Sequence, residues 1–123
     1  MSYLNDRVYD YGLNVLDTEA TRLDICSQEP ADYTAATSTY SKGSKTSLSV
    51  GAPAARSGGG REVTVAQISD GAVTATATVT HWAISDTANS RLLAAGSLAS
   101  SQADTSGNVF TLAAFTIGIP APA

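Results

Sequence analysis

The feature that most constrains this chain is a period of two residues between positions 62 and 85. Val73, Ala75, Ala77 and Val79 share one parity, and threonines occupy the positions between them. Successive side chains of a β-strand point to opposite faces of the sheet, so this period is typical of strands rather than helices. The β-branched Val and Thr also favour strands. We therefore predict a mainly β protein.

Asp70-Gly71 lies between two strand-like segments, and this dipeptide favours a hairpin turn. A three-residue turn that ends at Gly71 would pair Val63 with Ala77. The same register would pair Val65 with Ala75 and bring apolar side chains onto one face. It would also give Gly71 the left-handed conformation that such turns need. The sequence therefore predicts a hairpin here.

The alternation of apolar residues at every second position is interrupted twice. Val79 is at an odd position but Trp82 is at an even one, and Leu112 is at an even position but Phe115 is at an odd one. The first slip predicts either a β-bulge near Thr80-His81 or a strand buried on both faces. Such slips occur where strands curl into a barrel or cross between the sheets of a sandwich. The two architectures remain open at this point.

Other segments complete the predicted domain. Residues 22–27 alternate, with Leu23 and Ile25 on one face and Asp24 and Cys26 on the other, and Pro30 ends that strand. We expect a long loop or irregular edge over residues 31–46 and a short strand over 47–50. We also expect a turn over 86–90, a strand over 91–99 and a polar loop over 101–108. Pro120 and Pro122 stop the last strand.

The N-terminal segment has a helical rather than a strand-like period. Leu4, Val8, Tyr11 and Val15 recur at helical spacing, which predicts a short amphipathic helix over residues 3–17. The chain has 123 residues, enough for one domain. We expect an antiparallel β-sandwich or small barrel of about six strands over 21–119, a helical segment over 1–20 and a tail over 120–123.

Composition excludes several classes of protein. Ala, Ser and Thr occupy 51 positions, only 15% of residues are charged, and the net charge is −4, so a basic nucleic-acid-binding face is not expected. No apolar run is long enough to span a membrane, and no secretory signal is visible. A single Cys precludes an intramolecular disulfide, and one His with one Cys precludes the common zinc sites within one chain.

Catalytic, phosphate-binding and metal-binding motifs are also scarce in this sequence. His81 and Cys26 both lie within predicted strands, where packing is a simpler role than catalysis. The glycines at 58–60 lack the Gly-Lys-Ser/Thr ending and the helix of a phosphate loop. We therefore expect a non-enzymatic protein with no cofactor and no metal. Five tyrosines in the first third are suited to partial burial, to subunit contact or to ligand binding.

Several stretches resemble a family of small proteins encoded among the structural genes of tailed bacteriophages and prophages. The resemblance covers nearly the whole chain. It is carried by Tyr33 and by residues 21–30, 36–40, 43–46, 63–66, 70–71, 80–83, 98–102 and 110–112. It implies a virion component, made in the cytoplasm of the bacterial host. The small Ser, Thr and Ala side chains are compatible with close-packed contacts.

We therefore expect a non-enzymatic head decoration or cement protein that binds the major capsid protein or a neighbouring virion protein, and that forms a homo-oligomer. The residues expected to contact the partner are Tyr11, Arg22, Tyr33 and Tyr40. One alternative is a neck, tail or fibre-base subunit of the particle. Another is a carbohydrate- or ligand-binding β module.

Overall fold

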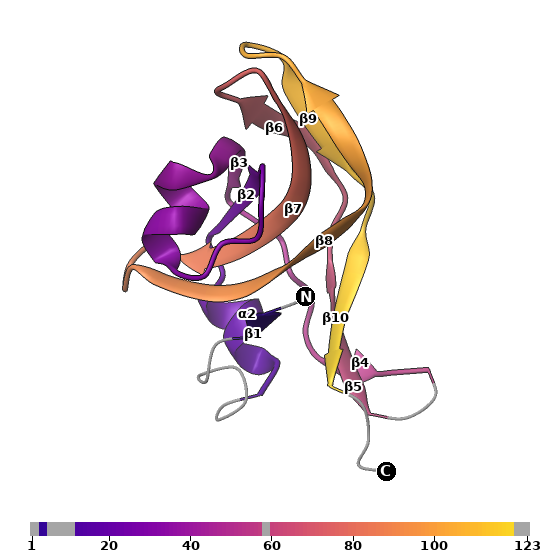
Figure 1. Cartoon of the computed structure of the whole chain (residues 1–123). Helices are drawn as coiled ribbons and strands as arrows, with labels where there is room; N and C mark the ends of the chain where they lie inside the picture. Colours follow the sequence, from indigo (N-terminus) through magenta and orange to yellow (C-terminus); the bar gives the residue numbers. More distant parts are fainter. Residues whose placement is uncertain (1–2, 5–11, 58–59, 120–123) are drawn as a thin grey trace.

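A computed structural model of the chain describes residues 3–4, 12–57 and 60–119. The described part is mainly β, with one short α-helix near the N-terminus and one π-helical turn (Figure 1). The strands are β1 Tyr3–Leu4, β2 Arg22–Cys26, β3 Ser41–Thr46, β4 Ala54–Ala55, β5 Arg61–Val65, β6 Ile68–Val73, β7 Ala77–Asp86, β8 Arg91–Asp104, β9 Val109–Leu112 and β10 Phe115–Ile119. The helices are α2 Asn14–Glu19 and the π-helix η1 Ala35–Thr39.

All described strand pairs are antiparallel, and they form two sheets. The larger sheet has the order β1-β8-β7-β2-β3-β6-β9, and the smaller has the order β10-β5-β4. The larger sheet curls into a half-barrel, while the small sheet extends from its lower end (Figure 1). The predicted antiparallel β fold with a short helix is confirmed, and its form is an open half-barrel.

The main core fills the inside of this curl. Leu23 and Ile25 of β2, Val79 and Ile84 of β7, and Phe110 of β9 are all buried there. Asp24 and Cys26 point to the opposite face, as the parity of β2 predicts. That face is covered by η1, whose Ala36 packs in a second cluster with Cys26, Ala83, Leu92 and Ala95. Strand β2 is therefore buried on both faces.

The hairpin predicted at Asp70-Gly71 is wrong. These residues lie inside β6, and Val63 pairs with Ile117 of β10 rather than with Ala77. Gly71 has no positive φ and serves a different purpose, because a Cβ at this position would overlap the ring of Phe110. The glycine is therefore required for close packing in a strand and not for a turn.

Two other expectations need correction. Residues 31–46 are neither a long loop nor an irregular edge, since they form η1 and then β3. Strand β3 pairs with both β2 and β6, although its Ser, Lys and Gly residues have weak strand propensity. Residues 47–50 form no strand beyond an isolated bridge from Val50 to Val65, because Ser47 has a φ of 55° and breaks the extended path.

A single helix over residues 3–17 is wrong. Tyr3–Leu4 forms strand β1 against β8, and α2 spans Asn14–Glu19. Residues 5–11 of the predicted helix lie outside the described part. Gly12 has a φ of +72°, which a right-handed helix cannot include. Val15 and Leu16 of α2 are buried in the main core, so the helix packs against the sheet of its own chain.

Candidate binding site at the open seam of the sheet

The half-barrel is open between β8 and β9, the second and last strands of the sheet order. A pocket of about 570 Å³ lies in this opening, and we call it the seam pocket. Its lining comes from β7, β8, β9, β10 and the residues between β9 and β10: Trp82, Gly96, Ser97, Leu98, Ala99, Ser100, Gln102, Leu112, Ala113, Ala114, Phe115 and Thr116. None of these lining residues is charged. The pocket therefore suits an uncharged occupant.

One wall of the seam pocket is a large bulge in β8. Ser97 pairs with His81 and Gln102 pairs with Val79, so residues 98–101 of β8 lie opposite Thr80 alone. The bulge predicted near Thr80-His81 is confirmed, although its extra residues belong to β8. An insertion of this size bends a strand and leaves its inserted residues outside the ladder. This bend lies along one wall of the pocket.

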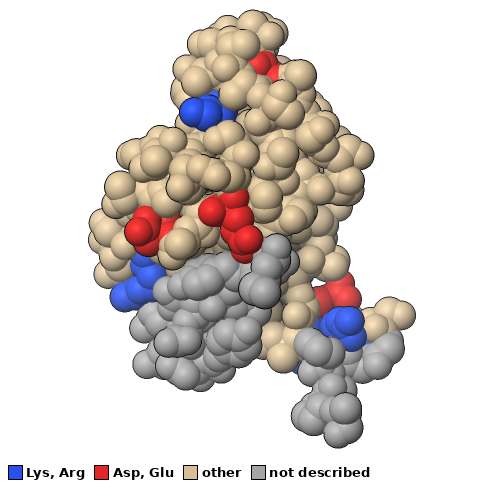
Figure 2. All heavy atoms as spheres, in the orientation of Figure 1, with Lys and Arg blue, Asp and Glu red and all other residues tan. Residues whose placement is uncertain are grey.

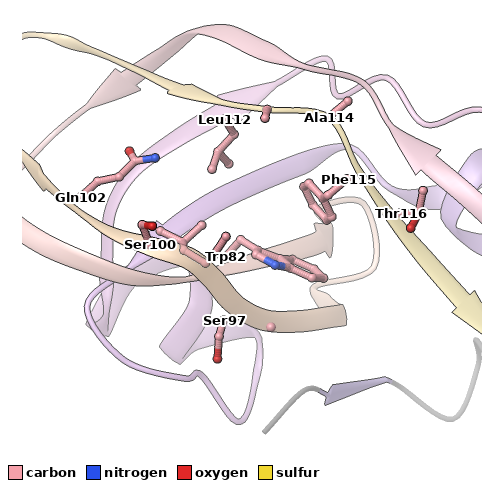
Figure 3. Close-up of a pocket in the computed structure, with 12 residues that line it drawn as sticks. Trp82, Ser97, Ser100, Gln102, Leu112, Ala114, Phe115 and Thr116 are labelled. Carbon is pink, nitrogen blue, oxygen red and sulfur yellow. The ribbon is translucent and has the colours of Figure 1, made fainter.

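Aromatic and amide side chains span the pocket at its two ends. Phe115 points from β10 toward Trp82 on β7, and the two ring centroids lie 4.7 Å apart (Figure 3). At the other end, Gln102 Nε2 of β8 donates a hydrogen bond of 3.1 Å to the carbonyl oxygen of Thr111 on β9. Between these two contacts, the described strand edges do not pair with each other.

Gly96 lets β8 pass close over the Trp82 ring. A Cβ at Gly96 would lie 2.8 Å from Trp82 Cζ2, so Gly96→Ala must displace the indole. We expect a shift in tryptophan emission and a loss of about 1–3 kcal/mol in the free energy of unfolding. At the control position Gly51 a Cβ would meet only Thr64 O, at 3.8 Å, and Gly51→Ala should leave both quantities nearly unchanged. Equal effects of the two substitutions would contradict this packing.

His81 lies beside the seam pocket but belongs to a chain of polar side chains. Thr80 Oγ1 donates to Ser27 O and lies 2.8 Å from His81 Nδ1, which makes Nδ1 the donor to Thr80 Oγ1. His81 Nε2 lies 3.4 Å from Ser97 Oγ. Ser97 points away from the pocket (Figure 3). This arrangement orients polar side chains across β7 and β8, as expected for a packed strand histidine.

The residues predicted to contact a partner lie elsewhere, on the face that η1 covers. Arg22, Tyr33 and Tyr40 come together around η1, while Tyr11 lies outside the described residues. Tyr40 is half-buried against the small cluster beneath η1, and Tyr33 is half-buried at the start of this turn. Arg22 Nη2 contacts Thr37 O at 3.4 Å. Arg22 of β2, together with Tyr33 and Tyr40 beside η1, thus forms one continuous surface, which we call the surface around η1.

An ion pair between the partly exposed Arg22 and the buried Asp24 stabilises this surface. Arg22 donates from Nε and Nη2 to the fully buried Asp24, at 2.9 and 2.8 Å, and Ser41 Oγ donates to Asp24 Oδ1 at 2.7 Å. Burial raises the pKa of Asp24 above its usual value, although the hydrogen bonds from Arg22 and Ser41 act in the opposite direction. Burial, with the charge of Asp24, also raises the pKa of the Cys26 thiol to about 12, so this cysteine is inert at neutral pH.

Figure 2 shows few charged side chains on one face of the molecule, and acidic and basic groups are scattered among neutral ones. Within residues 3–4, 12–57 and 60–119, no three His, Cys, Asp or Glu side chains form a group that could hold a metal ion. No helix in the same ranges is long and apolar enough to cross a bilayer.

Comparison of the chain with protein-family models, with curated proteins and with solved structures finds no match. The fold and the two surfaces described above therefore define the protein only as a small, open antiparallel β half-barrel with an uncharged seam pocket.

Proposed function

We propose that this chain is a non-enzymatic structural protein of a tailed-phage particle, specifically a head decoration or cement protein that binds the major capsid protein. The observation that carries the proposal is the resemblance to phage structural proteins over nearly the whole chain. Two surfaces of the fold support it, since the surface around η1 offers aromatic side chains and the seam pocket offers uncharged side chains and strand edges, both suited to protein contacts.

Co-purification with particles tests this proposal. Particles of the phage or prophage that encodes the chain are banded on a density gradient, washed in high salt and analysed by immunoblot. We expect the protein to remain in the particle band. Its loss into the soluble fraction before and after washing would contradict a structural role.

The surface around η1 gives a residue-level prediction. Tyr33→Ala and Tyr40→Ala should lower incorporation into particles, because each removes an aromatic contact from this surface. Tyr33→Phe and Tyr40→Phe keep the ring and serve as controls for folding and packing. Incorporation is measured by quantitative immunoblot of washed particles. Normal incorporation of both alanine variants would show that the partner contacts another surface.

Two alternative functions can each be distinguished from a head decoration protein by experiment. A neck, tail or fibre-base subunit would use the same two surfaces in a small closed ring, and copy number separates it from a shell protein. A carbohydrate-binding module is favoured by the seam pocket, whose lining includes the aromatic ring of Trp82 and the polar side chains of Gln102 and Thr116. Saturable quenching of Trp82 fluorescence by a soluble glycan would support that reading instead.

A further inference from the structure

We propose that residues 28–39 form a lid that opens as a unit from the face of β2 opposite the main core, while the two sheets stay folded. This segment contains η1 and lies beside β2 and β3 (Figure 1). The movement belongs to the chain itself and requires no partner, so it goes beyond the proposed function. Opening uncovers Cys26, which packs beneath Ala36 of η1 and is fully buried when the lid is closed.

The two ends of the lid meet at a fixed base. Ser27 N donates a hydrogen bond of 3.1 Å to Tyr40 O, so the chain enters and leaves the lid at the same place. Thr80 Oγ1 of β7 donates to Ser27 O at 3.1 Å and joins this base to the sheet. Compact loops with adjacent ends form separate surface units of a fold. The lid can therefore move without pulling β2 or β3 out of the sheet.

Short hydrogen bonds within the lid keep its shape. Asp32 Oδ1 accepts from Ala35 N at 2.7 Å, and Asp32 O accepts from Ala36 N at 3.0 Å. Thr37 Oγ1 donates to Tyr33 O at 2.8 Å. Each of these distances is usual for its kind of hydrogen bond, and each bond connects two lid residues. Because these bonds do not involve the sheet, they persist when the lid moves, and the segment opens as a unit.

The contacts between the lid and the sheet are weaker. Arg22 Nη2 of β2 contacts Thr37 O at 3.4 Å, and Cys26 Sγ lies 3.6 Å from Ala36 O. The first distance exceeds the usual range for an N–H···O hydrogen bond, and a thiol is a weak donor. Among residues 28–39, which the structure describes in full, only Pro30 and Ala36 are buried. Burial of two small side chains supplies little stability, and segments with few such contacts open at low free energy.

Opening the lid leaves no buried charge without its partner. Asp24 lies on the same face of β2 as Cys26, and it accepts hydrogen bonds from Arg22 of β2 and Ser41 of β3. Neither donor belongs to the lid, so the ion pair stays intact when the lid moves. Removing one partner of a buried pair is strongly destabilising, and this movement avoids that loss.

The position of the lid also controls the surface around η1. Tyr33 lies on the lid, whereas Arg22 lies on β2 and Tyr40 follows the lid at its base. These three side chains come together only while the lid is closed. The closed form is therefore the one that presents this surface to a partner.

Chemical labelling of Cys26, the single cysteine of the chain, tests the lid in the isolated protein. The thiol is fully buried and its pKa is raised to about 12, so dithiodipyridine reacts with it when the covering segment moves away. The labelling rate is measured at several urea concentrations below the unfolding transition, and Trp82 fluorescence follows global unfolding. We expect labelling to depend on urea much less steeply than global unfolding does, because the lid exposes little surface. An equally steep dependence, or immediate reaction at the rate of an exposed thiol, would overturn the lid.

Three variants supply a second readout. Ala36→Gly removes the methyl group that packs over Cys26, and it should speed labelling about fourfold relative to Ala35→Gly, which makes the same backbone change outside the small cluster. Val63→Ala removes a buried contact of β5 from the main core, so it should lower the urea midpoint and leave the labelling rate unchanged. Equal rates for the two glycine variants, or faster labelling of Val63→Ala in step with its lower midpoint, would overturn the lid. None of these measurements uses particles, so they test the lid separately from the structural role.

Discussion

Replacing Arg22 by Met should reduce the free energy of unfolding by about 3 kcal/mol at neutral pH. The substitution leaves Asp24 buried without its cationic partner, and breaking a buried pair on one side is strongly destabilising. The expected loss lies at the low end of the range for breaking a buried ion pair, because Ser41 still donates a hydrogen bond to Asp24. Urea unfolding followed by Trp82 fluorescence measures the loss.

The effect of Arg22→Met should depend on pH in a defined direction. Burial raises the folded-state pKa of Asp24 above 3.8, and loss of Arg22 removes interactions that lower it, so the pKa rises further. The folded state then binds a proton more readily than the unfolded state, and stability increases as pH falls through the folded-state pKa toward 3.8. The deficit of the variant should therefore shrink at acidic pH.

Two controls separate the buried pair from a general loss of charge. Lys45→Met breaks the pair with Asp70, which is 68% exposed, and should cost less than about 1 kcal/mol. Adding Asp24→Asn to Arg22→Met removes the buried charge and should recover part of the loss. A pH-independent deficit, or no recovery in the double variant, would contradict the role assigned to Asp24.

Replacing Phe110 by Ala should cost about 3–5 kcal/mol, because this side chain is 1% exposed and fills the inside of the half-barrel. Val109 precedes it on the same strand and is 64% exposed, so Val109→Ala should change stability by no more than about 0.5 kcal/mol. Thermal or urea unfolding of both variants checks the contrast. Similar losses at the two positions would contradict the orientation of β9.

Gly71 provides a second test of the same contact. Gly71→Ala alone should destabilise the protein, since its Cβ would overlap the Phe110 ring. In a Phe110→Ala background the added methyl group enters the space that the ring has left. The double variant should therefore be more stable than the sum of the two single losses predicts. Strict additivity would show that the two residues do not touch.

The sequence was sufficient to predict the β class and strand β2 with its two faces, and a bulge near Thr80-His81 was one of the two alternatives that it left open. Each of these follows from the alternation of apolar and polar residues, which is visible directly in the local sequence. Strand pairing was harder to predict, because the partner of a strand depends on residues that are far away in the chain. Asp70-Gly71 has the composition of a turn, yet the glycine is needed for the ring of Phe110, about forty residues later.

The seam pocket was not predicted, although its two walls coincide with the two parity slips. The slip beside His81 marks the β8 bulge, and the slip between Leu112 and Phe115 marks the point where the chain leaves the large sheet for the small one. The local sequence does not show that the β8 bulge and the junction of β9 and β10 face each other in the fold. That depends on the curl of the sheet, which is a property of all its strands together.

The most direct test of the proposed function is the number of copies of this protein per purified particle, measured by quantitative mass spectrometry against the major capsid protein. A head decoration protein should approach the copy number of the capsid protein. About a dozen copies or fewer would place the protein in the neck or tail, as expected for a small closed ring. Absence from washed particles would contradict the structural role altogether.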